Sequence, residues 1–146
     1  MTTINITTTI ERTYKNHGMH AEQTLVHELT GEIRKHDRVA YNVGSDIPEF
    51  NMSVKSSGAT LMSARFCESE IKEEILNQFF TYTASSSFAF VIDDLSMAYV
   101  MNKTEFMEFC TEFGYTSRES TKNGGGIKVQ FYKQSKRMIK WFEGHM

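Results

Sequence analysis

Apolar residues repeat at helical spacing in three long stretches of the chain. A first helix is predicted over residues 18–35, and a second over 71–82. A third begins at Asn102, which has the spacing of a capping box with Glu105, and it ends at Gly114. The apolar stripe of the first helix consists of Ala21, Leu25, Val26, Leu29 and Ile33.

Short runs of β-branched and aromatic residues between these helices predict strands. They cover residues 39–43, 52–56, 88–92, 97–101 and 127–132. Residues 1–16 form either a leading strand or a loosely held arm, and a short helix carrying Met138, Ile139 and Trp141 on its inner face ends the chain. This order predicts a single α/β domain over residues 1–146, with a mixed central sheet flanked by helices.

Composition narrows the class of protein. A chain of 146 residues is long enough to bury a substantial core, and its formal net charge of −2 gives no overall attraction to nucleic acid. Cys67 and Cys110 stand alone without a CxxC pattern, so we expect a reduced, cytoplasmic protein without structural zinc. No apolar run approaches the roughly 20 residues that a membrane span requires, so we expect no membrane partner.

Candidate chemistry lies in residues 44–57, GSDIPEFNMSVKSS. If the stretch around Pro48 makes a hairpin turn, Asp46 lies opposite Ser53 and shares a sheet face with Lys55. Glu49 is in the turn, and Glu22 approaches if the first helix packs on the sheet. Carboxylates with a nearby amine suit Mg²⁺ or Mn²⁺ and phosphate chemistry, although a polar turn beside a solvated lysine has the same pattern.

A family resemblance rests on these residues and the first helix. It joins G-x-x-x-E at Gly18 and Glu22, Asp46 followed by Ile47, and a strand ending in Val54-Lys55-Ser56-Ser57. The pattern resembles the PD-(D/E)XK nuclease superfamily, especially its restriction-endonuclease-like and Holliday-junction-resolvase-like members. The resemblance implies an αβββαβ core and a metal-dependent endonuclease that hydrolyses DNA or RNA. It also implies that Asp46 and Glu22 bind the metal while Lys55 orients or activates the attacking water.

Ser53 departs from this pattern, because the family motif has Asp or Glu at that position. Some restriction enzymes of the superfamily have an S-x-K version and supply the missing carboxylate from the following helix. Glu68 lies at the matching distance from Lys55, with Glu70 close behind. The resemblance therefore implies Glu68 or Glu70, and after them Glu49, as the replacement ligand, although the same segment also suits an ordinary acidic helix start.

A basic C-terminal extension, residues 117–146, is the second informative region. Between Ser117 and Trp141 seven basic residues face one acidic residue, a local excess of six positive charges. Such a patch attracts phosphate backbones, and Tyr132 and Trp141 offer stacking surfaces for bases. A solvated basic face is the alternative. The predicted nucleic-acid contacts are Lys122, Lys128, Lys133, Lys136, Arg137 and Lys140.

Three functions remain open at this level. The leading one is a nuclease that serves a phage or mobile element. We expect it to be able to form a homodimer, because small nucleases that cut both strands of a duplex often work as dimers. The second is a catalytically degraded nuclease fold that binds nucleic acid or a nucleoprotein, such as an inhibitor of a host defence complex. Ser53 favours this module, whereas Glu22, Asp46 and Lys55 together favour the enzyme. The third is a purely structural or regulatory protein partner.

Overall fold

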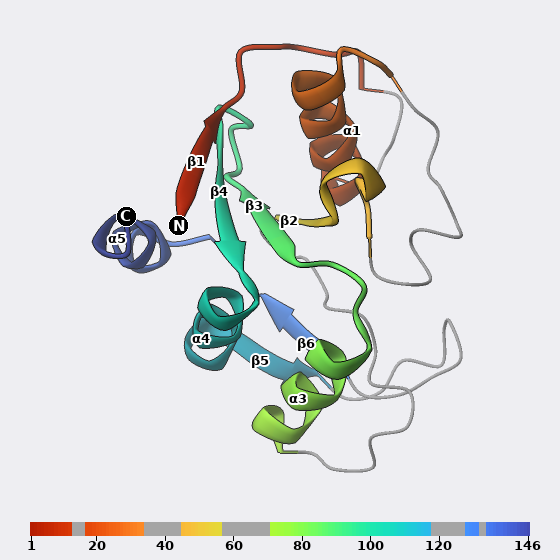
Figure 1. Cartoon of the computed structure of the whole chain (residues 1–146). Coiled ribbons are helices and arrows are strands. Elements are labelled where there is room, and N and C mark those ends of the chain that lie inside the picture. Colours follow the sequence, from red (N-terminus) through yellow and green to blue (C-terminus); the bar gives the residue numbers. More distant parts are fainter. Residues whose placement is uncertain (13–16, 34–44, 57–70, 118–127, 132–133) are drawn as a thin grey trace.

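The computed structural model describes residues 1–12, 17–33, 45–56, 71–117, 128–131 and 134–146 (Figure 1). Its elements follow the chain in an order that mixes helices and strands. They are β1 (Thr2–Asn5), α1 (His17–Thr30), the 3₁₀ turn η1 (Pro48–Phe50), β2 (Met52–Ser56), α3 (Lys72–Tyr82), β3 (Ser87–Val91), β4 (Met97–Asn102), α4 (Lys103–Phe113), β5 (Gly114–Ser117), β6 (Lys128–Phe131) and α5 (Lys136–Gly144).

The central sheet has four strands in the order β1-β4-β3-β2. β2 and β3 are parallel and are joined through α3, whereas β3–β4 and β4–β1 are antiparallel. The predicted α/β class with a mixed sheet is therefore confirmed. β5 and β6 form a separate antiparallel pair. The strand predicted at 39–43 lies outside the described residues, and among those described β2 is an edge strand of the sheet.

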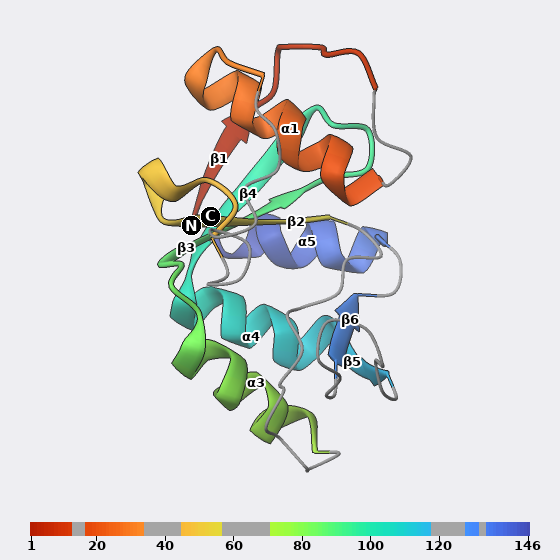
Figure 2. The same cartoon turned by 90° about the vertical axis from the view of Figure 1, so that its right-hand side faces the viewer.

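Helices cover both faces of this sheet. Figures 1 and 2 show α1 on one side and α3, α4 and α5 on the other. The α1 side is a small aliphatic core in which Leu25 and Val26 pack with Met52 and Val91. None of the helices formed by the described residues is both long and apolar enough to cross a membrane.

The opposite side is an aromatic core. Phe88 stacks on Phe106 with ring centroids 4.5 Å apart, and Tyr99 stacks on Phe142 at 4.4 Å. Each such buried ring removes enough apolar surface from water to stabilise the fold by about 1.5–3 kcal/mol. Met138 is buried as predicted, but the fully buried residue of α5 is Phe142, which the sequence prediction missed.

Helix ends follow local sequence closely. α4 has the predicted capping box between Asn102 and Glu105. It ends at Gly114, where a Cβ atom would lie 2.6 Å from the Cys110 carbonyl oxygen, so only glycine fits. α1 ends before Gly31, whose φ of +74° favours glycine. The expectation that Ile33 extends the apolar stripe is wrong: it lies past the helix end and is 74% exposed.

Candidate functional site at the sheet edge

The turn before β2 sets the geometry of the site. Ile47 and Met52 form an antiparallel bridge, and the backbone N–H groups of Asp46 and Ile47 both donate to the Met52 carbonyl at 2.9 Å. Asn51 closes the turn in the left-handed region with φ of 48°. This register places Asp46 opposite Ser53, as the sequence predicts.

Asp46 is held by the strand that it faces. Its Oδ2 accepts a 2.6 Å hydrogen bond from the Val54 backbone N–H and a 3.2 Å bond from the Ser53 hydroxyl. Ser53 is only 2% exposed, so its hydroxyl has little access to water and is used to orient the carboxylate. The residue that departs from the family motif is thus a structural support for Asp46.

Glu22 reaches the same place from α1. Burial is the largest cause that raises the pKa of Glu22 to about 8, followed by the negative charge of Asp46, while Lys55 acts in the opposite direction. A side-chain hydrogen bond with Asp46 raises that pKa further. At neutral pH the Glu22 carboxyl therefore keeps its proton and shares it with the Asp46 carboxylate.

Lys55 completes the cluster from β2. Its Nζ lies 5.9 Å from the centroid of the Phe79 ring on α3, and it interacts electrostatically with Glu22. With Glu22 protonated, the Asp46 carboxylate and the Lys55 ammonium balance each other. We call Glu22, Asp46 and Lys55 the acid–amine cluster; they come from α1, from the segment before η1 and from β2.

Of the other predicted metal ligands, the structure describes only Glu49. Glu49 is exposed on η1, while Glu68 and Glu70 lie outside the described residues. Among described side chains, no three of the types His, Cys, Asp and Glu are arranged to hold a metal ion. Glu22 and Asp46 nevertheless supply two hard oxygen donors, which suits an ion such as Mg²⁺ that is bound through one or two carboxylates plus water and substrate phosphate.

The basic patch is partly visible. Lys136, Arg137 and Lys140 are exposed on α5, but the Arg137 guanidinium donates to Glu112 at 2.9 Å and lies 5.1 Å from the Phe113 ring centroid. It therefore ties α5 to α4. Of the other predicted contacts, Lys122 and Lys133 lie outside the described residues, and Lys128 is in β6 with its side chain undescribed.

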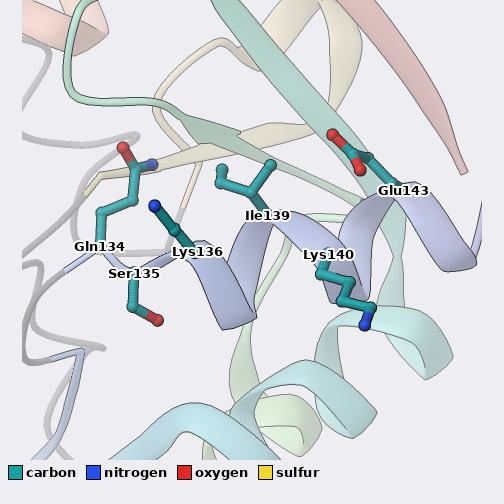
Figure 3. Close-up of a pocket in the computed structure, with 6 residues that line it drawn as sticks. All are labelled: Gln134, Ser135, Lys136, Ile139, Lys140 and Glu143. Carbon is teal, nitrogen blue, oxygen red and sulfur yellow. The ribbon is translucent and has the colours of Figure 1, made fainter.

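A shallow hollow of about 560 Å³ runs along α5. It is lined by Gln134, Ser135, Lys136, Ile139, Lys140 and Glu143. Figure 3 shows the Lys136 amine directed toward Gln134 and the Lys140 amine directed away from it, so the two cations diverge. The hollow suits contacts to an extended backbone better than a closed anion pocket.

Neither of the two aromatic residues predicted to stack on bases, Tyr132 and Trp141, is shown as a free stacking surface. Trp141 is half-buried, with the His145 ring stacked on it at 3.8 Å and Phe109 at 5.5 Å, and Tyr132 lies outside the described residues. Sequence reasoning missed Phe79 as a neighbour of Lys55. Phe79 belongs to the apolar stripe of the helix predicted over 71–82, which marks it as a core residue but does not show which strand its ring faces.

Comparison with protein-family models, curated proteins and solved structures finds no match to this chain. The fold and the site define an α/β protein with an acid–amine cluster at one edge of a mixed sheet.

Proposed function

We propose that the protein is a metal-dependent nuclease that hydrolyses phosphodiester bonds in DNA or RNA. The supporting observation is that Glu22 interacts with both Asp46 and Lys55 at one edge of the sheet. Glu22 and Lys55 are 33 positions apart in the sequence. A proton-sharing carboxyl pair beside an amine is an unusual arrangement for a purely structural surface, because each group costs free energy to bury.

Each residue of the acid–amine cluster has a distinct task in this proposal. Glu22 and Asp46 would hold Mg²⁺ or Mn²⁺, and Ser53 keeps the Asp46 carboxylate in place. The bound ion would supply Lewis-acid stabilisation of the charge that develops on the phosphate. Lys55 positions the attacking water or the phosphate oxygen through its ammonium protons, and Glu22 releases its proton to water when its oxygen becomes a ligand.

The fold is compatible with this assignment. The parallel β2–α3–β3 unit places the motif strand beside a second buried strand, and α1 carries Glu22 on the sheet. The finer assignment, a restriction-endonuclease-like αβββαβ core, is part of the proposal. As in the S-x-K version of the motif, a carboxylate from Glu68 or Glu70 would replace the one missing at Ser53 and complete the metal site.

A cleavage assay tests the proposal. The purified protein is incubated with single-stranded, duplex and branched DNA and with RNA, in Mg²⁺, in Mn²⁺ and in chelator. We expect metal-dependent cleavage that Asp46→Asn and Lys55→Ala abolish. The matched control is Asp94→Asn, which removes an exposed turn carboxylate far along the chain. Wild-type protein that leaves every substrate intact with both metals refutes the nuclease assignment.

A second candidate is a nucleic-acid-binding module with an inactive site. Two observations favour it: the acid–amine cluster is already charge-balanced by a proton, and α5 exposes Lys136 and Lys140. Binding measured in chelator separates the two functions. The module binds nucleic acid with an affinity that falls steeply with salt and is unchanged in Asp46→Asn, and it shows no cleavage.

A further inference from the structure

Lys55 sits on an edge strand with its side chain over the aromatic core. In the parallel register it lies beside Phe90, so both residues face the side of the sheet that α3 and α4 cover. A lysine in this place has a flexible stem and many conformations that would carry the ammonium into water. A further contact is therefore needed to favour the conformation in which the amine stays near Glu22.

Phe79 supplies the surface that the ammonium meets. Its ring centroid is 5.9 Å from Lys55 Nζ, within the range in which the negative face of an aromatic ring attracts a cation. The ring itself is fixed, because Phe79 is 3% exposed and Phe80 packs edge-on against it with centroids 5.0 Å apart. The amine thus lies near the Phe79 ring of α3, and it acts electrostatically on the Glu22 carboxyl of α1.

We propose that Phe79 is a positioning residue, which holds the Lys55 ammonium beside Glu22 and Asp46 through its ring face. This inference rests on the proposed nuclease function for its catalytic consequence. The contact itself belongs to the fold and is measurable without any substrate. Its physical content is a coupling between a ring and a charge, which a purely apolar packing role for Phe79 does not produce.

A double-mutant cycle tests the contact. Phe79→Leu and Lys55→Met are made singly and together, and the unfolding equilibrium of each protein is measured in urea. Loss of a cation–π pair should couple the two changes by about twofold to fivefold in the equilibrium constant. The matched cycle uses Phe106→Leu, a buried ring of the same core on α4. Coupling in the Phe79 cycle that is no larger than in the Phe106 cycle overturns the proposal.

Kinetics then test the positioning role in an active enzyme. Phe79→Leu should lower kcat about fivefold to tenfold with little change in KM, and Phe79→Tyr, which keeps the ring face, should restore most of the rate. If Phe79→Tyr does not fold, Phe79→Met is compared with Phe79→Leu instead. Both variants lack the ring face, so both should show the same fall in kcat. An active wild type with an unaltered kcat in Phe79→Leu overturns the proposal. If wild type cleaves nothing, the nuclease function fails, while the cycle still decides whether Phe79 holds Lys55.

Discussion

The raised pKa of Glu22 makes folding stability depend on pH. In the unfolded chain this carboxyl ionises near its ordinary value of 4.5, whereas in the folded protein its pKa is about 8. The folded state therefore binds more protons between these values, and stability falls as pH rises through that window. At about 1.4 kcal/mol for each tenfold change in proton affinity, the full loss is at most about 5 kcal/mol. Partial access of Glu22 to water reduces the expected loss to about 2–3 kcal/mol.

The substitution Glu22→Gln isolates this effect. Its amide has the shape of the protonated carboxyl and still donates a hydrogen bond to Asp46, but it cannot ionise. We expect the variant and the wild type to have similar unfolding free energies at pH 5. At pH 8.5 the variant should be more stable by about 2–3 kcal/mol.

Urea unfolding followed by the fluorescence of Trp141, the only tryptophan, gives these free energies at each pH. Glu28→Gln controls for the general effect of an amide on the same helix, since the Glu28 carboxylate bonds Thr7 instead of the acid–amine cluster. A constant difference between wild type and Glu22→Gln from pH 5 to 8.5 refutes the proton-sharing arrangement of Glu22 and Asp46.

Three further substitutions test other parts of the structure. Ser53→Asp adds a buried carboxylate beside Asp46, so the melting temperature should fall in chelator and recover on addition of Mg²⁺ or Mn²⁺; a metal-independent fall contradicts a cation site here. Asn102→Ala removes the α4 cap and should lower the unfolding free energy in urea by about 1 kcal/mol. An unchanged unfolding free energy would mean that the capping box does not form. Phe142→Ala empties a fully buried site and should cost about 3–5 kcal/mol by the same measurement, whereas a cost near zero would mean that α5 does not dock on the sheet.

Local signals in the sequence predicted the elements whose geometry is set by neighbouring residues. The cap of α4 depends on a side chain and a backbone group three positions apart, and Asn102 and Glu105 carry both. The turn before β2 similarly follows from Pro48 and the alternation after it, which is why the pairing of Asp46 with Ser53 was correct. Such features need no knowledge of the remaining chain.

Local signals do not predict features that depend on residues far apart in the sequence. The parallel pairing of β2 with β3 depends on where α3 returns the chain, and no short pattern specifies that partner. Phe142 was missed as the buried residue of α5 because the choice among the apolar residues of a nine-residue helix depends on rings from other elements, such as Tyr99 on β4 and Phe109 on α4. The resemblance to nucleases named Glu22, Asp46 and Lys55, but the raised pKa of Glu22 depends mainly on burial that only the folded chain supplies.

The state of Glu22 links the fold to the choice between enzyme and binding module. Two carboxyl groups that share a hydrogen bond in a partly buried place cannot both carry a full negative charge without compensation. The folded protein meets this requirement with a proton on Glu22 and the nearby Lys55 ammonium. In the proposed nuclease a divalent cation would meet the same requirement by replacing that proton, so cation and proton would compete for one position between Glu22 and Asp46. Within this proposal Ser53, which offers a hydroxyl in place of a third carboxylate, would shift the competition toward the proton. The proposed nuclease activity therefore requires another carboxylate, or the phosphate of the substrate, to shift this competition back toward the cation.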